Sequence, residues 1–233
     1  MKKIEAILTI ISILIPSVII AESKALPALL VSIQGKSIVY RDSSTIKLSA
    51  SDVRGFLFNE KDAISVVNGF IMIQIGSSSL CRFNKGSLII MKQLIAKVKE
   101  ENVNIFIKKG SGYFKVKKKY RNRGTLKIGT VTTVASVRGT SFIIDSFKDS
   151  SGILVDKGRL EIKRIKDNKT LFCQAGNQVV VKKDEIIENI LSADQKERFK
   201  IFKQFNLMEK IIFDALIKQL KMNEDSLKKF DKK

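Results

Sequence analysis

The chain has 233 residues, of which 44% are apolar, and they include 14 Phe but no Trp and no His. This apolar content suffices for one large globular domain, or for one domain with a smaller appendage. The lack of His removes the commonest general base and metal ligand, and two Cys are too few for a cysteine zinc site. We therefore expect no enzyme, no metal and no other cofactor.

The formal net charge is +20, with 43 Lys and Arg against 23 Asp and Glu. Such a charge favours acidic partners, for example anionic lipid, teichoic or nucleic polymers, or the carboxylates of peptidoglycan. The alternative is compositional, because codon drift in an AT-rich genome also enriches a chain in Lys, Ile and Asn.

Residues 1–21 are typical of a secretory signal. Two lysines precede a mainly apolar run over residues 6–20, and Ala21 offers a small residue for cleavage, with Ala25 as the alternative. The run is shorter than the roughly 20 apolar residues of a spanning helix, and Pro16 interrupts it. An uncleaved anchor is the other reading. We expect a bacterial protein that is exported to the periplasm or the cell surface.

Export matters for the two cysteines, Cys81 and Cys173. An oxidising compartment would allow a disulfide between them, closing a loop of about 90 residues and contributing roughly 4 kcal/mol on the chain-entropy model. The alternative is two separate buried thiols that act as small apolar side chains.

Short apolar runs separated by turn residues fill the chain from residue 28 to residue 185. Their spacing of about ten residues predicts an antiparallel β-sandwich or roll. Residues 91–102 fit a helical turn or another strand equally well. The turn signals are Gln34-Gly35-Lys36, Asn68-Gly69, Asn84-Lys85-Gly86, Asp156-Lys157-Gly158 and Gly176-Asn177.

A basic stretch lies between Glu101 and Asp145, where no acidic residue occurs. On a strand, alternate lysines would share one face, and such a row of like charges calls for solvent or an anion. We consider it a candidate ligand-binding stripe for a polymer or phosphate, the alternative being a solvated face that protects the sheet from aggregation. The stripe residues are Lys115, Lys117, Lys118, Lys119, Arg121 and Arg123.

The composition changes near residue 186, after which Gly and Pro are absent. Ser192 and Gln195 form a capping-box signature, and apolar side chains follow at steps of three or four, so residues 186–233 are predicted to be a helical extension. Its apolar face would dock on the β domain, or else pair with a second copy, a membrane surface or a partner protein. The partner-facing residues are Phe199, Phe202, Phe205, Ile212 and Leu216.

The stretch "TVTTVASVRGTSF" at residues 130–142 resembles the hallmark of the FecR family of exported bacterial domains. That pattern is Thr-Pro, a run of small and apolar residues, Arg-Gly-Thr, any residue, then Phe. Thr130, Arg138, Gly139, Thr140 and Phe142 match it, whereas Val131 replaces the proline and loses its fixed φ. "GILVDKGRLEI" resembles the strand pair that comes next in the family, with Gly158 as its glycine.

The resemblance implies a β-rich exported domain in which the Arg-Gly-Thr step is architectural. Gly139 would permit a bulge or a close backbone approach, Arg138 would turn onto carbonyls or a carboxylate, and Phe142 would pack in the core. An exposed Arg138 that contacts a ligand is the alternative. The family's best-known members regulate a sigma factor through an N-terminal cytoplasmic segment with tryptophans. The absence of Trp here argues against that route.

The function expected is therefore that of a non-enzymatic binding or scaffolding module in the cell envelope, directed at an anionic component or an envelope protein. One alternative is an adaptor that binds a partner through its C-terminal helix. Another is a membrane-anchored signalling protein with an uncleaved N-terminal segment. We do not expect nucleic acid as the partner, a membrane surface stays open, and the sequence leaves the oligomeric state undetermined.

Overall fold

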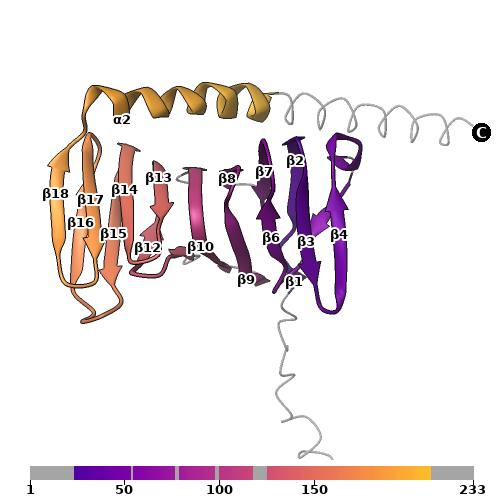
Figure 1. Cartoon of the computed structure of the whole chain (residues 1–233), viewed down its shortest axis with the longest axis horizontal. Helices are drawn as coiled ribbons and strands as arrows, with labels where there is room; N and C mark the ends of the chain where they lie inside the picture. Colours follow the sequence, from indigo (N-terminus) through magenta and orange to yellow (C-terminus); the bar gives the residue numbers. More distant parts are fainter. Residues whose placement is uncertain (1–23, 54, 77–78, 98–99, 118–124, 211–233) are drawn as a thin grey trace, which may run out of the picture.

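The computed structural model describes residues 24–53, 55–76, 79–97, 100–117 and 125–210 (Figure 1). Strands dominate these residues and form two sheets, and a helix lies along one side of them. The predicted β-sandwich is confirmed. The predicted signal at residues 1–21 lies outside the described residues, as do Lys118, Lys119, Arg121, Arg123, Ile212 and Leu216.

The first sheet, sheet A, has nine strands in its main order, and the short strand β1 (Lys24–Ala25) pairs with one of them, β9. A short 3-10 helix, η1 (Ala50–Val53), follows the edge strand. In spatial order the nine are β4 (Ser44–Leu48), β3 (Ser37–Arg41), β6 (Ala63–Val66), β9 (Leu88–Lys97), β10 (Glu100–Val116), β11 (Thr125–Gly129), β12 (Thr133–Val137), β15 (Arg159–Arg164) and β16 (Thr170–Gln174).

The second sheet, sheet B, is antiparallel throughout the described pairings and shares β10 with sheet A. In spatial order its strands are β5 (Leu57–Phe58), β2 (Ala28–Gln34), β7 (Phe70–Ile75), β8 (Ser79–Asn84), β10, β13 (Ser141–Ser146), β14 (Ser150–Lys157), β17 (Asn177–Lys182) and β18 (Ile186–Ile190).

Strand β10 joins the two sheets because its halves pair with different neighbours. Residues 102–106 pair with β11 in parallel, whereas residues 110–115 pair with β13 in sheet B. The crossing occurs at Gly110, whose φ is +96°. A Cβ at this position would lie 2.5 Å from the Cα of Ser87, so the crossing requires glycine both for its backbone conformation and for the close contact.

The main core fills the space between the sheets. Its largest members include Phe83, Phe114 and Phe142, all at most 1% exposed. The rings of Phe114 and Phe142 stack with 5.0 Å between centroids, and Phe83 meets Phe114 edge to face at 5.7 Å. These three rings come from β8, β10 and β13 of sheet B and fix the register of its centre.

The C-terminal helix begins one residue after the N-cap Ser192 and comprises α2 (Ala193–Glu197), η2 (Arg198–Lys200) and helical residues 201–210. The backbone N–H of Gln195 donates to Ser192 Oγ, and the N–H of Ser192 donates to Gln195 Oε1 at 2.9 Å. The predicted capping box is therefore confirmed. Figure 1 shows the helix running across the strands, from β18 toward β7.

The structure corrects one expectation from the sequence and decides two that the sequence had left open. Residues 186–190 are strand β18 and not part of the helical extension, because they pair with β17. Residues 91–102 belong to β9 and β10 apart from residues 98–99, which are not described. Cys81 in β8 and Cys173 in β16 are free buried thiols in strands of different sheets, so no disulfide joins them.

Within the described residues, no helix is both long enough and apolar enough to cross a membrane.

Candidate functional site

The Arg-Gly-Thr step forms the connection between β12 and β13, where it meets the turn between β14 and β15. Gly139 and Gly158 both have positive φ, +64° and +87°. A Cβ on Gly158 would lie 2.8 Å from the carbonyl oxygen of Gly139. The hydroxyl of Thr140 donates to the carbonyl oxygens of Arg138 and Arg159, each at 3.1 Å, which ties the two connections together. These contacts hold the two turns in one compact corner.

The Arg138 side chain does not take part in that corner. It is exposed, and among the described residues it forms no hydrogen bond or ion pair. The expected contact of its guanidinium with carbonyls or a carboxylate is therefore not formed within this part of the chain. Phe142, by contrast, is fully buried in the core.

Thr130 begins a chain of buried hydroxyls that connects the edges of the two sheets. Thr132 Oγ1 donates to Ser151 Oγ at 2.7 Å, and Ser151 Oγ donates to Thr130 Oγ1 at 2.7 Å. The N–H of Thr133 also donates to Thr130 Oγ1, at 3.0 Å. Because Thr130, Thr133 and Ser151 have no exposed surface, the hydroxyls satisfy one another where water is excluded.

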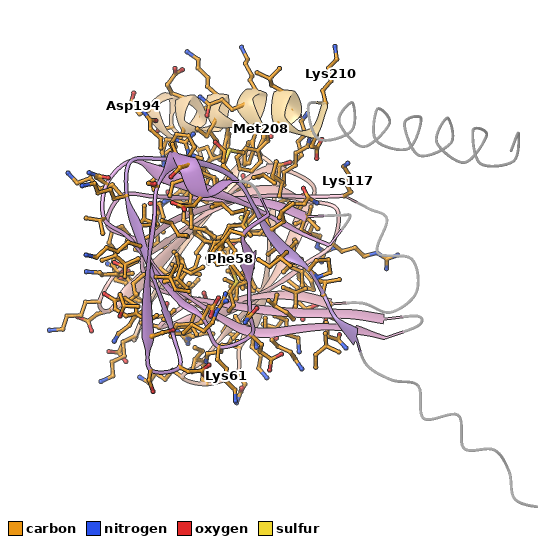
Figure 2. The ribbon with its side chains drawn as sticks, turned by 90° about the vertical axis from the view of Figure 1, so that its right-hand side faces the viewer. Phe58, Lys61, Lys117, Asp194, Met208 and Lys210 are labelled. Atoms are coloured by element: carbon orange, nitrogen blue, oxygen red, sulfur yellow. The ribbon has the colours of Figure 1, made fainter. Side chains whose placement is uncertain are left out.

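The two described members of the basic stripe, Lys115 and Lys117, lie on the outer face of sheet B beside the helix. Lys115 Nζ lies 2.6 Å from Glu209 Oε2 and 2.6 Å from Asn206 Oδ1. Lys117 Nζ lies 3.6 Å from the other oxygen of Glu209. In Figure 2, Lys117 lies on the side of the molecule that carries the helix. Both described lysines of the stripe are thus paired with the carboxylate of Glu209 in the same chain.

The helix covers an apolar patch on sheet B, which we call the helix cluster. Phe205 has no exposed surface and Phe202 is 7% exposed, and their rings meet edge to face at 5.3 Å. Met208 is labelled in Figure 2 at the junction of helix and sheet. The buried members of the cluster are Met72, Leu80, Tyr113, Ile143, Leu154, Leu191, Phe202 and Phe205.

One partly buried ion pair anchors the helix over this patch. Arg198 Nη1 and Nη2 each lie 2.7 Å from an oxygen of Asp145, in a bidentate arrangement. Ser111 Oγ donates to the same carboxylate at 2.6 Å. The hydrogen bonds to Asp145 raise the pKa of the Arg198 guanidinium further above its already high value. The pair therefore joins the helix to β13 and β10 by charge as well as by packing.

A second gathering of cations lies at the edge of the sandwich next to Thr132, and we call it the corner groove. It consists of two adjoining hollows of about 290 Å³ and 350 Å³ that share Asp149, Lys182 and Lys183. Val131 and Thr132, together with the turns after β13, β15 and β17, line the first hollow. Antiparallel pairing brings these turns to the same edge because each of them closes a hairpin.

Five cations line the first hollow, Lys148, Arg164, Lys166, Lys182 and Lys183, together with one carboxylate, Asp149. Three of the cations have acidic partners close by: Arg164 pairs with Asp167, Lys166 with Asp184, and Lys182 with Glu185. Lys148 and Lys183 form no ion pair with a described carboxylate.

The ion pairs shift the pKa values of the charged groups around the groove. The guanidinium of Arg164 lowers the pKa of the Asp167 carboxyl by hydrogen bonding, and the pKa of Arg164 is raised in return. Lys166 likewise lowers the pKa of Asp184, with a smaller contribution from Lys183. All these carboxylates are therefore ionised at neutral pH, and the groove keeps a modest positive excess.

The sequence did not reveal the corner groove, because its cations come from three turns that are separated from one another in the sequence. The available signal was the recurrence of Lys or Arg in the turns of three hairpins, near residues 148, 165 and 183. That signal acquires a meaning only when the strand order shows that these turns share an edge.

Residues 62–161 match the family model described as FecR protein, and the matched range contains the whole Arg-Gly-Thr corner. Residues 62–161 form a FecR domain. The resemblance drawn from residues 130–142 is thus confirmed. The matched range begins at Asp62, just before β6, and ends in β15, so the helix and the last three described strands lie outside it.

Two solved structures that align with the chain are crystal structures described as a "putative anti-sigma factor" from Parabacteroides distasonis ATCC 8503. One has 17% sequence identity and a TM-score of 0.47, and it covers 57% of this chain and 61% of that chain. The other has 16% identity and a TM-score of 0.48, and it covers 59% of this chain and 63% of that chain. The chain thus spans less than two thirds of either structure. No curated protein matches the sequence.

The described residues contain no group of three or more Cys, Asp or Glu side chains that is placed to hold a metal ion.

Proposed function

We propose that this chain is an exported, non-enzymatic FecR-domain protein that serves as a binding module in the cell envelope and recognises an anionic component. The observation that carries the proposal is the surplus of cations on a FecR β body. The chain has 43 Lys and Arg against 23 acidic residues, a surplus of 20 cations. A surface of this kind attracts polyanions and speeds their association.

The basic stripe is one place where such a ligand could bind. Its described members share Glu209, so the binding capacity of the stripe rests mainly on Lys118, Lys119, Arg121 and Arg123, which lie outside the described residues. Contacts between lysines and a polyanion release counterions, and their strength therefore falls steeply with salt concentration.

The test is a sedimentation assay of residues 22–233 with purified cell-wall sacculi and with inorganic polyphosphate, at 50 mM and 200 mM salt. We expect the affinity to fall by about tenfold or more over this range, because several cation contacts contribute together. A variant with Lys117, Lys118, Lys119, Arg121 and Arg123 changed to Ser shows how much of the binding the stripe supplies. Affinity that is equal at both salt concentrations would contradict the proposal.

The adaptor alternative, in which the C-terminal helix binds a partner protein, receives less support. Phe202 and Phe205 of the expected partner face are already buried against sheet B of the same chain. Deletion of residues 192–233, which leaves β18 complete, distinguishes the two roles. A docked helix predicts that the deletion exposes apolar surface that binds a hydrophobic dye, whereas a free partner-binding helix predicts an unchanged β body. The membrane-anchored alternative is tested by N-terminal sequencing of the mature protein.

A further inference from the structure

We propose that the corner groove is a binding site for a polymer of repeating oxyanions, phosphate or carboxylate. This inference rests on the proposed function and names the place where the anionic ligand is held. The groove lies at one edge of the sandwich, where Thr132 and the turns after β13, β15 and β17 line it.

The shape of the groove suits a segment of polymer. Its two hollows adjoin along Asp149, Lys182 and Lys183, and each has a volume near the lower end of the range typical of ligand pockets, about 300–1,000 Å³. An oxyanion group would be held in the first hollow, which five cations line against one carboxylate. The polymer would continue past the second hollow, where Asp149, Asp184 and Glu185 lie beside Lys182 and Lys183.

The donors in the groove are available to such a ligand. An ammonium group carries three N–H donors, so Lys166 and Lys182 keep donors beyond the one used on Asp184 or Glu185. Arg164 uses Nε and Nη2 on Asp167, which leaves Nη1 without a described partner. Oxyanions with several oxygen atoms satisfy donors that converge from different turns.

Lys148 and Lys183 distinguish this groove from the stripe. Lys115 and Lys117 share the carboxylate of Glu209, whereas Lys148 and Lys183 have no described ion-pair partner. A ligand that meets an unpaired lysine gains the interaction without first breaking an internal ion pair. Lys148 and Lys183 are thus more readily available to an anionic ligand than Lys115 and Lys117 are.

Rigid and apolar elements complete the site. Thr132 is fixed by its hydrogen bond to Ser151, within the buried hydroxyl chain behind the groove. Val131 and Ile165 add apolar surface, and Ile165 is 49% exposed. Such a surface can contact the uncharged parts of a polymer between its anionic groups.

The test compares charge-matched variants of residues 22–233. Lys148→Ser with Lys183→Ser removes the two unpaired cations of the groove. Lys47→Ser with Lys85→Ser removes two exposed cations from β4 and from the turn before β9, neither of which lines the groove. Both double variants lose the same net charge, and circular dichroism checks that each remains folded.

Binding is measured by calorimetry with inorganic polyphosphate and with poly-glutamate, which separate phosphate from carboxylate as the recognised group, and with neutral dextran as a blank. We expect the groove variant to lose about tenfold in affinity for one polyanion and its salt slope to fall by about two. The control variant should change by less than about threefold. Asp149→Asn, which removes a carboxylate from the groove, should tighten binding about twofold.

The possible outcomes distinguish failure of the groove from failure of the proposed function. Equal losses in the two double variants would overturn the groove but leave the binding of an anionic component intact. Absence of wild-type binding to both polyanions would overturn the proposed function together with the groove. A loss confined to the groove variant supports both.

Discussion

The two outer faces of the sandwich differ in what covers them. In sheet B, β13 is buried at all six positions and β14 at five consecutive positions, because the helix packs on the side away from the core. In sheet A, β15 and β16 alternate between exposed and buried residues, as a sheet with one solvated face should. A strand that is buried on both of its faces therefore marks the sheet that the helix covers.

The strongest test of this difference removes an aromatic ring from each face. Phe205→Ala should lower the free energy of unfolding by about 3 kcal/mol, because the ring is fully buried in the helix cluster and leaves a cavity. Phe172→Ala on sheet A should cost less than about 1 kcal/mol, because that ring is 46% exposed and its described aromatic interaction is with Arg159. Urea unfolding of both variants measures the two losses of unfolding free energy. Equal losses would show that packing of Phe205 under the helix stabilises the fold no more than the half-exposed Phe172 does.

A second test addresses the ion pair that anchors the helix. Arg198→Ala should lower the free energy of unfolding by about 2 kcal/mol, because the 11% exposed side chain of Asp145 would lose its bidentate partner. The matched control is Lys200→Ala, which breaks the exposed pair with Glu197 and should cost under about 0.5 kcal/mol. Thermal unfolding of the two variants checks the prediction. An Arg198 variant as stable as the control would mean that packing alone holds the helix.

The two cysteines report on the same contrast through their reactivity. Burial raises the pKa of both thiols, that of Cys173 to about 12, so both should react slowly with iodoacetamide at pH 8 and faster as the pH rises. Cys173 lies in the edge strand β16, whereas Cys81 lies in a central strand below the helix, so Cys173 should react about tenfold faster. Mass spectrometry of timed samples measures the two rates. Equal rates would indicate that both thiols become accessible only in global unfolding.

The smallest expected effect concerns Glu209. Glu209→Gln removes the carboxylate shared by Lys115 and Lys117 and should cost less than about 1 kcal/mol, an effect that salt reduces further because the pair is partly exposed. It should also strengthen polyanion binding slightly if the stripe contributes to it. Unfolding at low and high salt measures the first effect. A large loss of stability that is insensitive to salt would contradict this assignment.

The fold could be predicted from the sequence to a useful degree because its signals are local. Turn dipeptides and the period-2 pattern indicate the strands, and the Ser192 capping box marks the start of the helix. Residues 186–190 resemble the helix in composition, since they too lack Gly and Pro, and composition alone therefore places them in the helical extension. Only pairing with β17 makes them a strand, and such pairing is not encoded in local composition.

The candidate site was less predictable because it depends on tertiary arrangement. Lys115 and Lys117 form a clear run in the sequence, but Glu209, which pairs with them, is more than 90 residues away. The corner groove has the opposite character, because Lys148 and Lys183 are far apart in the sequence and come together only through strand order. Arg138 belongs to the family motif, yet its side chain lies exposed outside the corner that the motif builds.

The position of the helix along the chain has a consequence for biosynthesis. Residues 193–210 are translated after all of the described strands, so the outer face of sheet B, with Met72, Leu80 and Ile143, has no cover until they emerge. A nascent chain that has completed its strands therefore presents an apolar surface of the kind that chaperones bind and that promotes aggregation. The emergence of residues 193–210 is thus the step at which the apolar outer face of sheet B becomes covered.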